Sequence, residues 1–276
     1  MVDDEIALLR ESARRSAALG NRHVSNLSNS FAIQDYQQMA NEIAALAGGG
    51  RLLDWGCGYG HMSWLLRRRG FEVVSLTVPD ANNLSDSWNL LVREQGLRVI
   101  VAEDDVVLPF DDESFDVVLS CGVLEHVPDE LRSVSEIARI LRPGGYFLVY
   151  QLPNWLSVVE WLSERLVGIA HERRYKLRQV AGLFAGTGLA IKSSRHGSMI
   201  PKNLDRLPLL RRLFDNHYHL VAGLDSLLLR VPLLSLLSGT WEIVAQKAPA
   251  PVLDDRTPAQ RDPVTAQSGS HAAHRR

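Results

Sequence analysis

A glycine-rich loop between an apolar strand and a helix constrains the fold of this chain more than any other feature. Residues 51–55 form a short apolar run that contains Asp54, and Gly56, Cys57, Gly58 and Gly60 follow it in the segment LLDWGCGYG. Glycines allow tight turns and let a ligand approach the backbone without a Cβ in the way. The helix that begins at residue 61 offers free N–H groups to a carboxylate or phosphate. The segment therefore predicts a ligand-binding turn at the end of a buried strand.

Strands and helices alternate along most of the chain. Near-continuous apolar strands separated by helices are typical of a parallel sheet covered on both faces. The apolar and β-branched runs predict strands at residues 51–55, 71–77, 97–102, 115–120, 146–151, 189–193 and 241–246. Helical spacing and stop signals predict helices at residues 61–69, 84–95, 130–141 and 176–185.

The predicted organisation is one α/β domain at residues 1–248 followed by a tail. We expect N-terminal helices at residues 1–47, a ligand-binding core at 48–155, an acceptor region at 156–238 and the last strand at 240–247. The leucine- and arginine-rich segment 204–238 is too long for an ordinary connection, so it predicts an inserted helical lid. Residues 249–276 lack periodicity and large apolar side chains, which indicates a disordered tail.

Composition excludes several classes of protein. With 276 residues, 46% hydrophobic and 22% charged, the chain is neither fibrous nor wholly disordered. It has no apolar run long enough to span a bilayer and no secretory signal at its start, and its two cysteines do not suggest a disulfide framework. We therefore expect a soluble, cytoplasmic protein, with peripheral membrane contact as a second option.

The net charge of −2 conceals a strong asymmetry along the chain. Residues 1–164 contain 13 Lys and Arg against 24 Asp and Glu, whereas residues 165–230 contain 12 against 4. Three interpretations of the basic part stay open. Its leucines cover a substrate pocket while the arginines stay in solvent, or the segment lies on an anionic membrane. Nucleic acid is the third, and we do not expect it because no nucleic-acid module accompanies the arginines.

Four motifs together resemble the class I S-adenosylmethionine-dependent methyltransferases. LLDWGCGYG is similar to the first motif of that family, a strand ending in D-x-G-C-G-x-G. Further blocks resemble it in the same order: LPF at 108–110 with DESFDVV at 112–118, VLEHV at 123–127 and LRPGG at 141–145. The resemblance covers roughly residues 40–155. It implies a Rossmann-like, seven-stranded, mostly parallel sheet with helices on both faces, to which the length of segment 204–238 adds a helical insertion before the last strand.

The resemblance also implies a binding site for S-adenosyl-L-methionine. Gly56, Cys57, Gly58 and Gly60 would pass along the methionine part of that cofactor, with Asp54 near its amino group. The family usually has an acidic residue at the end of the second strand for the ribose hydroxyls. Here Thr77 stands at that position, so one hydroxyl replaces a carboxylate, and Asp80 is the nearest acid that can reach back.

Further residues of the cofactor site follow from the same resemblance. Asp104 and Asp105 precede the LPF block, where the family holds the adenine ring. Ser120 and Cys121, at the end of the fourth strand, would line the cofactor side of the cleft. Cys57 and Cys121 are better interpreted as packing residues than as nucleophiles.

Candidate catalytic bases are His126 and His171. His126 lies in the VLEHV block, near the expected position of the transferable methyl group, and His171 opens a stretch that resembles H-x-R-x-[YF] in small-molecule and lipid-pathway members. Each is a candidate general base, with a structural role as the alternative. We expect no metal site.

The leading functional hypothesis is methyl transfer from S-adenosyl-L-methionine to oxygen of a small or lipid-linked acceptor. Transfer to nitrogen or carbon is second within that hypothesis. A catalytically silent cofactor-binding relative is an alternative because of Thr77. A nucleotide-dependent oxidoreductase is a weaker one, since G-x-G-x-G departs from the dinucleotide spacing G-x-G-x-x-G.

Overall fold

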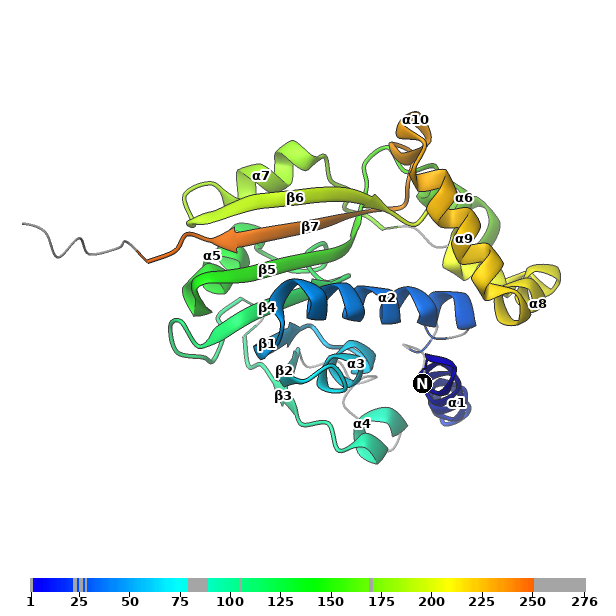
Figure 1. The fold of residues 1–276 in the computed structure, drawn as a ribbon, viewed down its shortest axis with the longest axis horizontal. Helices are drawn as coiled ribbons and strands as arrows, with labels where there is room; N and C mark the ends of the chain where they lie inside the picture. Colours follow the sequence, from blue (N-terminus) through cyan, green and yellow to red (C-terminus); the bar gives the residue numbers. More distant parts are fainter. Residues whose placement is uncertain are drawn as a thin grey trace, which may run out of the picture.

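The fold is a seven-stranded sheet with helices on both faces, as seen in a computed structural model that describes residues 2–21, 24, 27, 29–78, 89–104, 106–168 and 171–250 (Figure 1). The strand order is β3-β2-β1-β4-β5-β7-β6. The strands are β1 (Gly50–Trp55), β2 (Phe71–Thr77), β3 (Val99–Val101), β4 (Phe115–Cys121), β5 (Leu141–Pro153), β6 (Leu189–Gly197) and β7 (Thr240–Lys247).

The sheet is mostly parallel, as the sequence predicts. The first five strands pair in parallel, while β7 runs antiparallel to both β5 and β6. Alternating side chains of the central strands enter different cores: Leu52 faces one side and Leu53 the other, both fully buried. This two-sided burial explains why the strands are continuous apolar runs instead of alternating ones.

Each face of the sheet has its own layer of helices. Helices α1 (Val2–Ala18), α2 (Ser30–Ala47), α3 (His61–Arg67) and α4 (Leu90–Gln95) contribute to the core on the Leu52 side. Helices α5 (Glu130–Ile140) and α7 (Leu177–Phe184) pack on the Leu53 side.

The segment between β6 and β7 is helical, as predicted. It contains the 3-10 helix η2 (Lys202–Arg206) and helices α8 (Pro208–Asn216), α9 (Tyr218–Leu229) and α10 (Pro232–Ser235). Because β6 runs parallel to β5, this segment leaves the sheet at the carboxyl ends of the parallel strands, beside α6 (Val158–Val167) (Figure 1). Phe214 and Val221 pack against Phe31 of α2 and so hold the segment to the body of the protein.

Several predicted boundaries need correction. Strand β5 begins at Leu141, five residues before the predicted Tyr146, because Leu141 already pairs with Phe115 ahead of a register shift. The Pro-Gly-Gly turn is therefore an irregularity within a strand, not a linker before one. Strand β6 extends four residues beyond the predicted end at 193 because it pairs with β7 along its whole length.

Other sequence predictions fall partly outside the described residues. Of the helix predicted at 84–95, residues 90–95 are helical as α4, and residues 84–88 lie outside the described part of the chain. The predicted tail lies outside it from residue 251 onward. Within the described residues, no helix combines the length and apolarity that crossing a bilayer requires.

Candidate cofactor and acceptor site

The glycine loop joins β1 to α3, and its three glycines have different roles. All three have positive φ, at 73° for Gly56, 50° for Gly58 and 84° for Gly60. A Cβ at Gly56 would lie 2.6 Å from a methyl carbon of Val123, and one at Gly60 would lie 3.0 Å from Leu97. At Gly58 the nearest atom would be 4.0 Å away. Gly56 and Gly60 are thus required by packing, whereas Gly58 faces open space that suits close approach of a ligand.

Cys57 is held inside the loop by backbone hydrogen bonds. Its N–H donates to the carbonyl oxygen of Leu76 at 2.8 Å, and its own carbonyl accepts from the N–H of Gly60 at 2.8 Å. Burial raises the thiol pKa of Cys57 and also that of Cys121. Both thiols stay protonated at neutral pH, which supports the interpretation of these cysteines as packing residues.

Asp54 is buried at the end of β1 and is part of a chain of hydrogen bonds. The Ser63 hydroxyl donates to Asp54 Oδ2 at 2.5 Å, and the Ser75 hydroxyl donates to Ser63 at 2.7 Å. Burial raises the pKa of Asp54 to about 6, although its hydrogen bonds with Ser63 lower it in part. A cationic ligand group beside this carboxylate would lower the pKa again.

Thr77 ends β2 next to the loop, and its side chain is buried. Its hydroxyl has one long contact, 3.4 Å to the carbonyl of Val78, so it can still donate to a ligand hydroxyl. Asp80, the acid proposed to reach back toward the same place, lies outside the described residues, as does Asp105.

Asp104 lies in the loop after β3 and orders that loop. Its Oδ1 accepts from the N–H groups of Val106 and Val107 at 2.7 and 2.8 Å, and these two bonds lower the pKa of the carboxyl group. The side chain is exposed, and its Oδ2 carries neither of these two bonds. Asp104 is thus an ionised acceptor at the position where the adenine amino group is expected.

Ser120 and Cys121 end β4 beside the glycine loop. Ser120 pairs with Trp55 across the sheet and is fully buried. Among the described residues its hydroxyl has no hydrogen-bond partner. A buried hydroxyl without a partner is costly, so a ligand or water atom is the expected partner at this point.

The loop after β4 and the loop before α7 bring together Glu125, His126 and His171. The centroids of the His126 and His171 imidazole rings are 5.9 Å apart. The Glu125 carboxylate is also near, with its Oε1 3.8 Å from His126 Nε2. The Glu160 carboxylate lies 3.0 Å from His171 Nδ1 and raises the pKa of that imidazole. Burial lowers the pKa of His126, while it raises that of Glu125 to about 7.

A cluster of polar side chains around Tyr36, His61 and Lys202 was not predicted from the sequence. Tyr36 of α2 packs edge-on against His61, at 4.3 Å between centroids, and donates to Gln151 Oε1 at 3.3 Å. Both ring nitrogens of His61 are buried without a partner among the described residues, and its pKa falls to about 4, mainly through burial and partly through the Lys202 charge. The Lys202 ammonium forms an ion pair with Asp35. Of these residues, the sequence drew attention only to the position of His61, where the helix after the glycine loop was predicted to begin.

Two cavities of about 490 and 480 Å³ lie beside this region. The first is lined by charged and polar residues of α2, β6, β7 and α9, among them Asp35, Arg195 and Glu242. The second borders Glu130, Trp155 and the 172–175 loop that follows His171. Neither includes a residue that the sequence assigned to the cofactor.

Comparison with known proteins decides the class of domain. Residues 53–149 match a family described as "Methyltransferase domain". A protein of Mycolicibacterium smegmatis described as a probable S-adenosylmethionine-dependent methyltransferase is 31% identical over 179 residues, 60% of this chain and 65% of its own length. Residues 53–149 form a class I, S-adenosylmethionine-dependent methyltransferase domain.

Two further relatives of the methyltransferase domain have descriptions that name a lipid substrate. The fatty-acid O-methyltransferase of M. smegmatis is 33% identical over 179 residues, 60% of this chain and 64% of that protein. The phthiotriol/phenolphthiotriol dimycocerosates methyltransferase 1 of Mycobacterium ulcerans is 34% identical over 143 residues, 51% of each chain. The matches cover less than two thirds of each of these three relatives.

Solved structures confirm the fold of the methyltransferase domain. The [4+2]-cyclase SpnF has a TM-score of 0.53 at 22% identity, covering 77% of this chain and 81% of its own. A putative sarcosine dimethylglycine methyltransferase from Galdieria sulphuraria has a TM-score of 0.52 at 19% identity, covering 78% and 86%. Because one of these is a cyclase, the fold alone does not decide the reaction.

The buried carboxyl group of Asp54 predicts a pH dependence of cofactor binding. A ligand ammonium favours the ionised form, and the pKa of about 6 in the free protein means that the carboxyl group is increasingly protonated below that pH. We expect affinity for S-adenosylhomocysteine to fall as pH drops from about 7 to about 5, by up to tenfold per unit. Calorimetry of the isosteric Asp54→Asn variant should show weaker binding and a flatter profile. If affinity depends on pH equally in Asp54→Asn and in the wild type, Asp54 does not bind the amino group of the ligand.

Asp104 is tested by a substitution that preserves its loop. In Asp104→Asn the side-chain oxygen can still accept from Val106 and Val107, but an amide replaces the free carboxylate oxygen. We expect affinity for S-adenosylhomocysteine to fall, because the adenine amino group would lose its charged acceptor. Asp112→Asn is the control, since the Asp112 side chain is exposed and pairs with Arg139 instead of with the N–H groups of Val106 and Val107. Equal effects of the two substitutions would refute the adenine assignment.

Proposed function

We propose that the protein transfers the methyl group of S-adenosyl-L-methionine to an oxygen atom of a lipid-like acceptor. The observation that carries the proposal is the glycine loop within the matched methyltransferase domain. There Gly58 faces open space directly beside the carboxyl ends of β1 and β4. Ligands of open α/β sheets bind outside the carboxyl ends of the strands.

The residues present fit this cofactor. Gly58 leaves room for its amino-acid part, the buried Asp54 carboxylate suits its ammonium group, and the Ser120 hydroxyl has no partner among the residues that the structure describes. We assign Thr77 to the ribose and Asp104 to the adenine amino group, because the Thr77 hydroxyl has only a long contact and Asp104 Oδ1 alone accepts the bonds from its loop. When bound, the cofactor supplies an electrophilic methyl group on a sulfonium.

The acceptor end of the site is proposed at Glu125, His126 and His171. Of the two histidines, His126 is the better proton acceptor, because its lowered pKa keeps the imidazole neutral, whereas Glu160 favours the charged form of His171. A positioned base contributes about 10²–10⁴-fold to a reaction that involves proton transfer. This assignment supports transfer to a hydroxyl or carboxyl oxygen, which must lose a proton.

The apolar surface at the same end of the sheet supports a lipid acceptor. We define the leucine surface as the exposed large apolar residues of segments 155–166 and 209–236. They are Trp155, Leu156, Val158, Trp161, Leu166, Leu209, Leu213, Leu220, Leu224, Leu227, Val231, Leu233, Leu234 and Leu236. If these side chains covered a substrate pocket they would be buried, yet Leu209 is 92% exposed. Their exposure favours contact with lipid over a simple lid.

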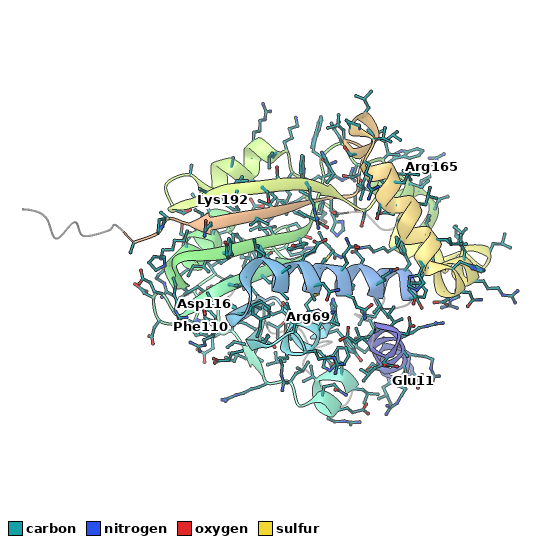
Figure 2. The ribbon with its side chains drawn as sticks, in the orientation of Figure 1. Glu11, Arg69, Phe110, Asp116, Arg165 and Lys192 are labelled. Carbon is teal, nitrogen blue, oxygen red and sulfur yellow. The ribbon has the colours of Figure 1, made fainter. Side chains whose placement is uncertain are left out.

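Basic side chains accompany the leucine surface. Arg165 lies on α6 next to Leu166, at the end of the molecule where α9 also lies (Figure 2), and Arg211, Arg212 and Arg230 are also exposed on the same segments. Apolar side chains flanked by arginines are typical of surfaces that lie on anionic membranes. We infer that this face docks on a lipid surface from which the acceptor enters. The two relatives named for lipids support the same class of acceptor.

The proposal is tested with defined acceptors of equal chain length. Purified protein is incubated with methyl-labelled S-adenosyl-L-methionine and a long-chain fatty acid, a long-chain alcohol or phenol, or a long-chain amine, each presented in vesicles. We expect label in the carboxyl or hydroxyl acceptor and little in the amine. Label only in the amine would overturn oxygen as the acceptor atom, and label in water-soluble short-chain analogues alone would overturn the lipid class.

A further inference from the structure

We propose that Glu125, His126 and His171 bind one divalent transition-metal cation. One ligand atom from each residue lies within 4.8 Å of the others, although two of the residues come from the loop after β4 and the third from the loop before α7. From the sequence we expected no metal site, and Glu125-His126 and His171 are separated by 44 residues along the chain.

The Glu125 carboxylate is the strongest indication of a missing ligand. Its side chain is only 2% exposed, and neither oxygen has a hydrogen-bond partner among the described residues. Oε1 points toward the imidazoles, 3.8 Å from His126 Nε2. Buried carboxylates are normally paired, hydrogen-bonded or coordinated to metal. A cation between Glu125 and the two histidines would satisfy both oxygens.

Glu160 holds His171 in the orientation that metal ligation requires. Its Oε2 lies 3.0 Å from His171 Nδ1 and also accepts from the His171 backbone N–H at 2.9 Å. With the proton on Nδ1, the Nε2 lone pair is free to coordinate. A carboxylate bonded to the far nitrogen of a ligand histidine is the usual outer contact of such sites, and it fixes both the tautomer and the ring orientation.

The donor set selects the kind of cation. Two imidazoles and one carboxylate suit Zn²⁺ and neighbouring transition metals, whereas Mg²⁺ and Ca²⁺ prefer oxygen ligands. Ligand atoms about 2.1 Å from a tetrahedral ion lie about 3.4 Å apart, so distances within the cluster, which reach 4.8 Å, must shorten by up to about 1.4 Å. His126 can provide this movement because its side chain is 65% exposed, and that exposure also gives an ion access.

The role of the cation rests on the proposed function, but its binding does not. Three protein ligands leave a coordination position open. Gly122, just after β4, would place a Cβ 3.8 Å from Glu125 Oε1, so the cluster adjoins the cofactor end of that strand. An acceptor oxygen at the open position would lose its proton more easily. The proton would pass to solvent water, the two histidines would act as ligands, and the His126 base of the proposed function would not be needed.

The test is direct metal binding by the full chain after removal of metal with a chelator. Calorimetric titration with Zn²⁺ alone should show one site per chain, and the same titration with Mg²⁺ should show much weaker binding. Glu125→Gln and His126→Asn should each weaken Zn²⁺ binding at least tenfold, and Glu160→Gln should weaken it by roughly 10–100-fold. The matched control is His196→Asn, because His196 lies on β6, bonds to Ser238 and is not part of the cluster.

The result separates this proposal from the proposed function. S-adenosylhomocysteine affinity, measured on the same samples, reports the cofactor site whatever happens to the metal. The absence of Zn²⁺ binding, tighter binding of Mg²⁺ than of Zn²⁺, or Zn²⁺ binding that survives in both Glu125→Gln and His126→Asn would overturn the metal site. The exposed His126 variant keeps the test valid if Glu125→Gln fails to fold.

Discussion

Gly58→Val is expected to abolish binding of S-adenosylmethionine and S-adenosylhomocysteine. A Cβ at this position meets no protein atom closer than 4.0 Å, so the branched side chain would occupy the open space beside the loop and not the core. Loss of contact with the amino-acid part of the ligand, together with steric exclusion, should reduce affinity by more than about 100-fold, or roughly 3 kcal/mol. Calorimetric titration with S-adenosylhomocysteine measures the loss.

The matched control for this variant is Gly144→Val. Gly144 also has positive φ, at 80°, and a Cβ there meets nothing within 4 Å, but it lies in the turn at the start of β5, away from the glycine loop. Both variants should lose a similar amount of stability, about 1–2 kcal/mol, from forcing a side chain into the left-handed region. Wild-type affinity in a folded Gly58→Val protein would show that the cofactor site has been placed wrongly.

Replacing three leucines of the leucine surface should abolish vesicle binding. Leu209, Leu220 and Leu233 are 92%, 71% and 79% exposed, so their change to Asp costs little stability. If they enter lipid, each contributes about 1–2 kcal/mol, and their combined loss should weaken binding to anionic vesicles at least about 100-fold. Co-sedimentation with vesicles of phosphatidylglycerol and phosphatidylcholine measures this, while affinity for S-adenosylhomocysteine should not change.

Exposed leucines elsewhere provide the control for the vesicle experiment. Leu19, Leu46 and Leu131 lie outside the leucine surface, and their joint change to Asp should leave vesicle binding intact. Arg211→Glu with Arg212→Glu should weaken binding at low salt by about 1 kcal/mol or more per residue. If the wild type does not sediment with anionic vesicles at low salt, the lipid-docking part of the proposal is wrong.

The sheet could be predicted from the sequence because its signals are local. Residues such as Leu52 and Leu53 are buried on opposite faces, so the central strands appear as unbroken apolar runs ended by glycines. The start of β5 could not be predicted in this way. Leu141 belongs to the strand only because it pairs with Phe115, and Pro143 and the glycines that follow indicate a turn when the partner strand is unknown.

The candidate site was predictable only where one segment carries it. The positions of Asp54, the glycines and Ser120 in the fold were predictable because the sequence indicates where β1 and β4 end. Tyr36, His61 and Lys202 meet only through the packing of α2, α3 and η2, so no spacing in the sequence connects them. The same holds for the contact of Glu125 with His171, and it explains why the sequence indicated separate bases and no metal cluster.

Methyl transfer into a lipid fraction tests the central claim most directly. The purified protein is incubated with methyl-labelled S-adenosyl-L-methionine and a total lipid extract, beside a Gly58→Val sample, and the lipids are separated and examined by mass spectrometry. The account predicts one or more lipids that gain a labelled methyl group on oxygen with the wild type and none with the variant. Label that stays entirely in the cofactor, while S-adenosylhomocysteine still binds, would contradict the account and identify a catalytically silent relative.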